Sequence, residues 1–272
     1  MAGKLVKGLA WGGFVVGCAL VKSILQQSRH WDLNEKVVLI TGGSRGLGYE
    51  MVKAFAARGA ELIIASRKLD NCEKVADEVR ALGRRALAVS AHVGKWPECD
   101  ALIEAAYAEY GRVDILVNNA GMSPASRSHE MPEKLFDSVL NLNFKGPFRL
   151  ATQIGHRMSC GDGGCIINVS STGALMALPQ AVTYGAAKAA LNAMTVSLSR
   201  EYAPKVRVNT LSAGPFLTDI AKSWDPEALK RLPLPLGRAG NPPEIVTAAL
   251  MLASPASSFT TGALLRVDGG QR

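Results

Sequence analysis

The sequence predicts an α/β fold: one domain with a doubly wound parallel sheet of about seven strands and helices on both faces. Three observations predict it. Short apolar runs without polar alternation recur along the chain, helical stretches separate them, and a glycine-rich turn directly follows the first run. Strands buried on both faces show such continuous apolar runs, and alternating strands and helices form one parallel sheet. A (β/α)8 barrel also alternates, but the strand count and the glycine-rich turn favour the open sheet.

The elements follow one another with short links, so we expect a single catalytic domain over residues 33–272 with a lid at about 213–240. Strands are predicted at Val37–Ile40, Leu62–Ala65, Ala86–Val89, Ile115–Val117, Ile166–Ser170, Val206–Val208 and Ala263–Val267. Helices between them include Tyr49–Ala57, Asn71–Leu82 and Pro97–Tyr110.

Composition restricts the class of function. Hydrophobic residues make up 48% of the chain and charged residues 20%, which is enough to bury a core. The net charge of +8 favours an anionic cofactor or substrate. We expect no nucleic-acid partner, because no run of Lys and Arg is interleaved with aromatic residues. The five cysteines form no C-x-x-C pair, so no metal site is predicted and a reducing, cytoplasmic compartment is expected.

Residues 1–32 are predicted to be a hydrophobic extension and linker ahead of the domain. Gly8–Val21 carries no charge and is flanked by Lys4, Lys7 and Lys22. This run is shorter than the ~20 apolar residues of a spanning helix. Three interpretations stay open: a membrane-surface or shallow anchor formed by residues 8–21, a helix packed on this subunit or a neighbour, and a disordered segment.

The glycine-rich turn Thr41–Gly48 follows the first strand and opens the first helix. Glycines there let the backbone approach a pyrophosphate, and free N–H groups at the helix start meet its negative charge. The spacing is T-G-x-x-x-G-x-G, which resembles the short-chain dehydrogenase/reductase family from about Leu33 to the C-terminus and implies a Rossmann-like fold with a nicotinamide cofactor. The cofactor-binding residues expected in this turn are Gly42, Ser44, Arg45, Gly46, Leu47 and Gly48.

The residues after the second strand are expected to choose the cofactor. An acidic side chain there would hold the ribose hydroxyls of NAD, but this chain has Ser66 and Arg67. Arg67 can form a fork with a phosphate and Ser66 can donate to it, while Arg45 supplies a second cation. We therefore expect NADP(H). In the alternative, Arg67 is merely solvated and Asp70 takes the ribose.

Two further strand ends complete the expected cofactor site. The resemblance implies that His92 and Val93 lie at the adenine, although the family commonly has aspartate where His92 stands, and a purely structural histidine is the alternative. Asn118-Asn119-Ala120-Gly121 matches the family's N-N-A-G. By this resemblance Asn118 ties neighbouring strands, and Asn119, Ala120 and Gly121 lie against the nicotinamide ribose.

Tyr184 and Lys188 form a Y-x-x-x-K pair, which carries the predicted chemistry. Residues at i and i+4 share a helix face, so the lysine charge, helped by the charge of the oxidised nicotinamide, can lower the pKa of the tyrosine from about 10 toward neutrality. Ser171 precedes Tyr184 by the family's usual interval, and Asn143 lies in the family's N-x-x-G. The resemblance implies that Ser171 and Tyr184 bind the carbonyl oxygen, that Tyr184 is the general acid, and that Lys188 and Asn143 position ribose and water.

The segment after the sixth strand resembles the family's P-G-x-x-x-T loop, with Ala213 in place of the proline. Gly214, Phe216 and Thr218 keep their positions as cofactor contacts, and loss of the proline is expected to loosen the loop. Apolar residues over 216–236 and Leu175–Leu178 predict a small lipophilic substrate, namely a 3-oxoacyl thioester or a steroid-like or terpenoid-like carbonyl. Arg149 and Arg157 could then face an acidic acyl carrier.

The sequence thus predicts an NADPH-dependent carbonyl reductase. The resemblance implies a homodimer or homotetramer assembled through the alanine-rich helix Ala186–Ala193 and the C-terminal Val267–Gly270. Two other classes compete: a sugar-nucleotide epimerase on the same fold, which usually has a larger C-terminal substrate region, and an NADPH-binding scaffold without catalysis.

Overall fold

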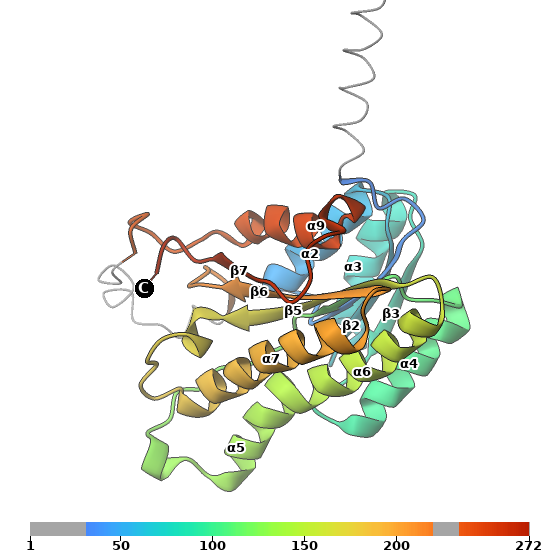
Figure 1. Cartoon of the computed structure of the whole chain (residues 1–272). Coiled ribbons are helices and arrows are strands. Elements are labelled where there is room, and N and C mark those ends of the chain that lie inside the picture. The colour runs from blue at the N-terminus through green and yellow to red at the C-terminus, as the bar shows by residue number, and fades with distance from the viewer. Residues whose placement is uncertain (1–30, 220–233, 272) are drawn as a thin grey trace, which may run out of the picture.

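The computed structural model describes residues 31–219 and 234–271 (Figure 1). The predicted segment at residues 8–21 and most of the predicted lid, residues 220–233, lie outside the described residues. Within the described ranges, no helix has the length and apolar character required to cross a membrane.

Seven strands form one sheet in the order β3-β2-β1-β4-β5-β6-β7, and every neighbouring pair is parallel. This confirms the predicted doubly wound fold, because the order reverses between β1 and β4 and leaves the sheet open. The strands are β1 Val37–Thr41, β2 Glu61–Ser66, β3 Ala86–Ser90, β4 Ile115–Asn118, β5 Gly164–Ser171, β6 Val206–Ala213 and β7 Leu264–Val267.

Helices cover both faces of the sheet (Figure 1). On one face lie α2 Gly46–Ala57, α3 Leu69–Ala81 and α9 Val246–Ala253. On the other face lie α4 Trp96–Tyr110, α6 Gly146–Cys160 and α7 Val182–Glu201. The short helix α5 Glu133–Leu140 leads into α6 through a π-helical turn, Asn141–Lys145.

Alternation along the strands divides the core between the two faces. Val38 and Ile40 of β1 pack with the α2, α3 and α9 layer, while Val37 and Leu39 pack with the other layer. Both faces of β1 are therefore buried, which explains why its sequence is a continuous apolar run without polar alternation.

The sixth strand is longer than the sequence indicated. It continues through Ser212 and Ala213, which pair with Arg266 and Val267 of β7. Ala213 is therefore buried inside the sheet rather than at the head of a loop. The Gly214 N–H also donates to the Val267 carbonyl at 2.9 Å, so the chain is tied to β7 up to this residue, and loosening of the loop beyond it stays a prediction.

Candidate active site

At the crevice where the strand order reverses, hydrogen bonds of Thr41 and Asn119 connect the end of β1 to the residues after β4. The Thr41 hydroxyl accepts hydrogen bonds from the backbone N–H groups of Asn119 at 3.0 Å and Ala120 at 3.1 Å. The Asn119 side-chain amide donates to the carbonyls of Thr41 at 2.9 Å and Gly42 at 3.3 Å. Asn119 therefore fixes the glycine-rich turn against β4. The sequence placed Thr41 in the motif but gave no sign of this role, because its partners Asn119 and Ala120 are distant along the chain.

The glycine-rich turn fits a phosphate group. Gly42 adopts φ +66°, and a Cβ on Gly48 would lie 2.2 Å from the Gly42 carbonyl oxygen. The turn thus requires glycine where it folds back on itself. Arg45 precedes α2 without a side-chain cap, and the first turn of α2 has no acidic residue. The N–H groups of this helix start are consequently available to an anion.

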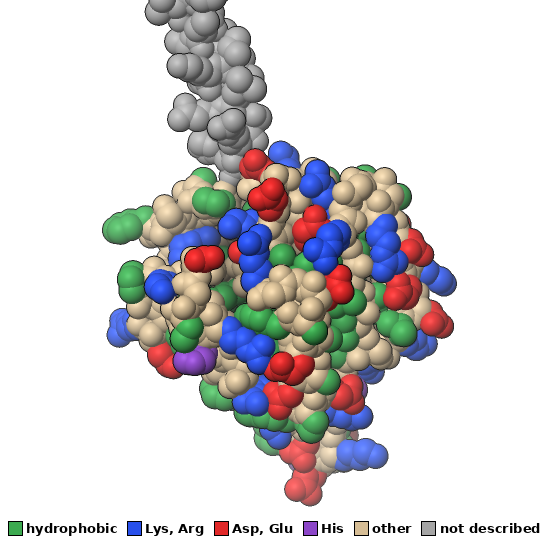
Figure 2. Space-filling view, turned by 90° about the vertical axis from the view of Figure 1, so that its right-hand side faces the viewer, with side chains coloured by type: hydrophobic (Ala, Val, Ile, Leu, Met, Phe, Trp, Pro, Cys, Tyr) green, Lys and Arg blue, Asp and Glu red, His purple; other side chains and the backbone are tan. Residues whose placement is uncertain are grey.

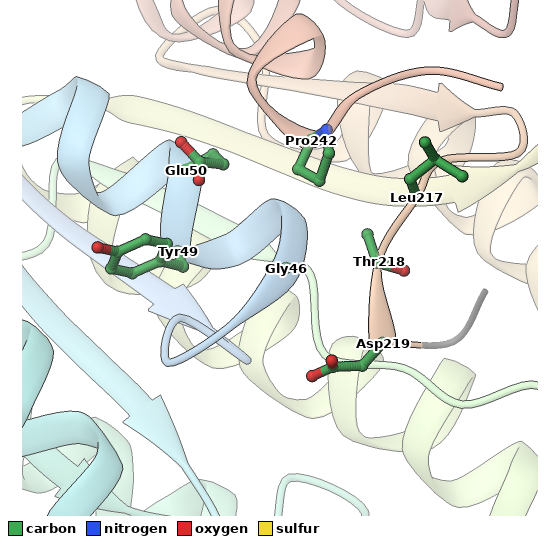
Figure 3. Close-up of a pocket in the computed structure, with 7 residues that line it drawn as sticks. All are labelled: Gly46, Tyr49, Glu50, Leu217, Thr218, Asp219 and Pro242. Atoms are coloured by element: carbon green, nitrogen blue, oxygen red, sulfur yellow. The ribbon is translucent and has the colours of Figure 1, made fainter. Parts of the chain in front are cut away.

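A cavity of about 450 Å³ lies beside the start of α2 and is lined in part by Gly46, Thr218 and Asp219 (Figure 3). Thr218 is close to the turn, because a Cβ on Gly46 would lie 3.5 Å from its methyl group. The Arg45 guanidinium pairs with the Asp219 carboxylate at 3.5 Å. The structure therefore brings Thr218 to the glycine-rich turn and places the acidic side chain of Asp219 beside it, and a cofactor contact for Thr218 stays a prediction.

The end of β2 presents a hydroxyl and a free cation. Ser66 is partly buried and accepts a hydrogen bond from Ser44 of the glycine-rich turn at 3.0 Å. Arg67 is exposed, and its guanidinium makes no ion pair or hydrogen bond with the residues that the structure describes. The backbone carbonyl of Arg67 accepts from Ser90 of β3 at 3.2 Å. Ser66 and Arg67 thus lie side by side, and the Arg67 guanidinium is accessible to an anion.

His92 and Val93 follow β3 and lie beside the π-helical turn and the start of α6. The His92 Nδ1 accepts from the Gly94 N–H at 3.2 Å, and the His92 N–H donates to Glu98 at 2.6 Å. Val93 is buried, and a Cβ on Gly146 would clash with its carbonyl. These contacts give His92 a structural role, and an adenine contact for it stays a prediction.

Tyr184 and Lys188 lie on the face of α7 that meets β5. The Lys188 ammonium is buried, donates to the Val169 carbonyl at 2.8 Å, and lies 5.9 Å from the centroid of the Tyr184 ring. Ser171, the last residue of β5, hydrogen-bonds to Tyr184 and accepts from the Gly173 N–H at 3.1 Å. The three predicted side chains are therefore brought together.

Asn143 joins this group through the π-helical turn. Its amide donates to the carbonyls of Met122 and Val139, both at 2.9 Å, and its Oδ1 accepts from the Met122 N–H at 3.3 Å. A Cβ on Gly121 would lie 2.8 Å from the Asn143 Oδ1 and 3.6 Å from the Lys188 Nζ. Asn143 and Lys188 therefore border the same backbone position.

Burial controls the protonation of the pair. It lowers the pKa of Lys188 to about 8, so the ammonium is still charged at neutral pH. Burial also raises the pKa of Tyr184, and the hydrogen bond from Ser171 offsets this only in part. The predicted lowering of the Tyr184 pKa is therefore not seen in the protein alone, and it stays a prediction for the complex with the oxidised nicotinamide. The Lys188 ammonium is directed to the Val169 carbonyl.

A buried polar network holds α7 in register with the sheet. Asn118 of β4 donates to Asn168 of β5 at 2.9 Å, and Asn168 donates to Thr195 of α7 at 2.9 Å. Ser170 donates to the Lys188 carbonyl at 3.3 Å. The predicted strand-tying role of Asn118 is confirmed, and the network extends it to the helix that carries Tyr184.

The substrate side is apolar where the structure describes it. A hollow of about 510 Å³ lies between the segment Gly173–Ala181 and α7 and is lined by Met176, Leu178 and Val182 among others. Gly173 connects it to the site, because a Cβ there would lie 2.8 Å from Leu178 and 3.5 Å from the Tyr184 ring. This segment is the apolar wall that the sequence predicted.

Two residues of the loop after β6 have packing roles. Phe216 is buried in the core, and a Cβ on Gly240 would lie 2.7 Å from its ring. A Cβ on Gly214 would lie 2.5 Å from the Asp268 Cα. Neither Gly214 nor Phe216 has a polar side chain, so any contact that they make with a cofactor would involve backbone atoms or the Phe216 ring.

Comparisons with known proteins identify relatives over most of the chain. Residues 36–229 match the family model described as short chain dehydrogenase. The NAD-dependent glycerol dehydrogenase of Listeria innocua is 34% identical over 247 residues, which cover 89% of this chain and 96% of that protein.

Two solved structures have the same fold. A 7α-hydroxysteroid dehydrogenase complexed with NADH and 7-oxo glycochenodeoxycholic acid is 33% identical, covers 90% of this chain and 98% of its own, and gives a TM-score of 0.86. The 3-ketoacyl-(acyl-carrier-protein) reductase of Brucella melitensis, complexed with NADH, is 34% identical, covers 88% and 99%, and gives a TM-score of 0.82.

Proposed function

This chain belongs to the short-chain dehydrogenase/reductase family, and from that premise we propose that it is an NADPH-dependent reductase of a lipophilic ketone or aldehyde. As a member of the family it is an oxidoreductase of alcohol and carbonyl groups with a nicotinamide cofactor. The observation that carries the proposal is the contact of Ser171 with Tyr184, beside Lys188 and at the strand ends where α2 presents its free N–H groups.

The cofactor would be held by the glycine-rich turn, by Ser66 and Arg67, and by the strand ends at His92–Val93 and Asn119–Gly121. When bound, its nicotinamide supplies a hydride to a carbonyl carbon or accepts one from an alcohol. Arg67 supports the choice of NADPH because its guanidinium is exposed at the end of β2, has no partner among residues 31–219 and 234–271, and suits a phosphate. The relatives described with NAD or NADH make this preference the first point to test.

Tyr184 is suited to give a proton to the substrate oxygen. Its raised pKa keeps the phenol protonated at neutral pH, which is the state that a general acid needs in the direction of reduction. Ser171 orients the substrate oxygen by a second hydrogen bond. The charged Lys188 ammonium favours the tyrosinate that forms when the proton leaves. Asn143 borders Gly121 together with Lys188, and there it could order a water that returns a proton to Tyr184.

The substrate is proposed to be lipophilic because the wall next to Tyr184 is apolar. Leu175 and Leu178 are exposed beside the hollow that Met176 also lines. A carrier-bound acyl group is the less favoured of the two substrate classes, because Arg149 and Arg157 already pair with Asp100 and Glu104 of α4. A steroid-like or terpenoid-like carbonyl needs no such cations.

The assembly and location follow from the same features. We propose a homodimer or homotetramer, since Val182 and Val196 are exposed on α7 with 56% and 44% of their surface accessible. A reducing compartment such as the cytoplasm fits the four described cysteines, which are all free. Basic and acidic side chains alternate over the face in Figure 2, which supports the expectation of no nucleic-acid partner.

The proposal is tested by following cofactor oxidation spectroscopically with a panel of carbonyl compounds. We expect turnover with NADPH and a steroid-like or other lipophilic ketone, weaker turnover with NADH, and none with a sugar nucleotide. An epimerase consumes no cofactor overall, so conversion of a sugar nucleotide into its epimer, detected by chromatography without net oxidation of NADPH, would favour the epimerase alternative. Binding of NADPH without turnover of any carbonyl would favour the scaffold.

A further inference from the structure

A chain of three small polar side chains lies beneath the end of β2. The Ser44 hydroxyl donates to the Ser66 hydroxyl at 3.0 Å, and the Ser66 oxygen lies 3.0 Å from the Cys72 sulfur. The Cys72 thiol has two possible acceptors for its one hydrogen, the Ser66 oxygen and, farther away, the Val89 carbonyl at 3.7 Å. Ser66 therefore stands between the glycine-rich turn and the first turn of α3, and its two hydrogen-bond neighbours come from different elements.

We infer that Cys72 is a positioning residue for cofactor choice: its thiol donates to the Ser66 oxygen and thereby directs the Ser66 hydrogen toward a 2′-phosphate. This inference rests on the proposed preference for NADPH. It assigns a function to a cysteine to which the sequence alone gave no role.

The number of hydrogens and lone pairs in the cluster supports this role for Cys72. A serine hydroxyl has one hydrogen and two lone pairs. Ser44 fills one lone pair of Ser66, and the Cys72 thiol can fill the other. The single hydrogen of Ser66 then has no partner inside the cluster and is available to an acceptor at the end of β2. A phosphate at neutral pH offers charged acceptors to this hydrogen, whereas a ribose 2′-hydroxyl offers only a neutral acceptor and gains less from it.

Burial supports the donor role of the thiol. Cys72 is fully buried in the α2, α3 and α9 layer of the core. Burial raises the pKa of the thiol, so the sulfur keeps its hydrogen at neutral pH. The rigid surroundings also hold the sulfur at a fixed distance from Ser66, because β2, β3 and α3 all contribute to the cluster.

The test compares Cys72→Ala and Cys72→Ser with a matched control, Cys165→Ala. Cys165 is buried in the same core layer, but its thiol donates to the Leu252 carbonyl at 3.3 Å, away from Ser66. The measurement is the Kd for NADPH and for NADH, by titration calorimetry on each full-length variant. The ratio of the two Kd values separates an effect on the phosphate from a general loss of packing.

We expect Cys72→Ala to weaken NADPH binding by about three- to tenfold, the value of one hydrogen bond, with little change for NADH. Cys72→Ser should keep the wild-type ratio because it retains a donor at the same place. Cys165→Ala should also keep it. An unchanged ratio in Cys72→Ala, or an equal loss for both cofactors, would overturn the inference.

The outcome is distinguishable from failure of the proposed function. If the wild type binds NADH more tightly than NADPH, the proposed NADPH preference is wrong whatever the variants do. If the wild type prefers NADPH and Cys72→Ala retains that preference, only the role of Cys72 is wrong.

Discussion

The two halves of the crevice differ in whether their polar side chains are buried and hydrogen-bonded within the protein or exposed to solvent. On the side of β4, β5 and α7, Asn143 and Lys188 are buried and hydrogen-bonded to backbone carbonyls. On the side of β1, β2 and α2, the Arg67 guanidinium is exposed and unpaired within the described ranges, and Arg45 is held only by an exposed ion pair.

This difference separates reaction from cofactor choice. The catalytic half obtains its properties from desolvation, which raises the pKa of Tyr184 and lowers that of Lys188. The cofactor half depends on cations in contact with water, where interactions are weaker and screened by salt. Substitutions in the catalytic half should therefore change turnover or stability strongly. Those in the cofactor half should change affinity moderately and in a salt-dependent way.

The largest effect is expected from Tyr184→Phe. Loss of the phenol removes the proton donor, so kcat should fall by about a thousandfold or more, while the Kd for NADPH changes little. Steady-state kinetics and a binding titration measure the two quantities.

Ser197→Ala is a suitable control, because this exposed residue of the same helix bonds only its own turn. Substantial turnover by Tyr184→Phe would contradict the assignment of the general acid. A comparably large increase in the Kd for NADPH in Tyr184→Phe would instead show that the two halves of the crevice do not act independently.

Lys188→Met is expected to lose turnover and yet gain stability at neutral pH. The wild type retains a buried ammonium whose pKa falls from 10.5 to about 8, which costs about 3 kcal/mol of folding free energy. The freed Val169 carbonyl offsets part of this gain, leaving about 1–2 kcal/mol.

The pH dependence fixes the sign of that prediction. The unfolded lysine keeps its proton up to about pH 10.5, whereas the folded one releases it near pH 8. The cost to the wild type is thus complete below pH 8 and disappears as the pH rises to about 10.5. Urea unfolding of both proteins at pH 7, 8.5 and 10 should show the advantage of the variant shrinking. A constant difference would mean that the lysine does not titrate in this range.

Arg67→Ala is expected to have the smallest of these effects. Loss of one exposed phosphate contact should raise the KM for NADPH about tenfold and leave that for NADH unchanged, since no phosphate is present to bind. The effect should decrease at high ionic strength.

Arg58→Ala provides the matched charge change, because Arg58 is exposed at the opposite end of α2. Equal shifts for both cofactors in Arg67→Ala would favour the alternative in which Arg67 is merely solvated. A shift in Arg58→Ala as large as that in Arg67→Ala would mean that net charge alone attracts the cofactor.

The sequence by itself determined the doubly wound sheet and the positions of Tyr184, Lys188 and the glycine-rich turn. These features depend on local periodicity: apolar runs mark strands buried on both faces, and a spacing of four places two side chains on one helix face. Only the tertiary structure decided the extent of β6 through Ala213 and the partners of Arg45 and Cys72. It also decided the protonation of Tyr184, because burial and contacts between distant segments arise from how the helices pack on the sheet, and no local pattern contains them.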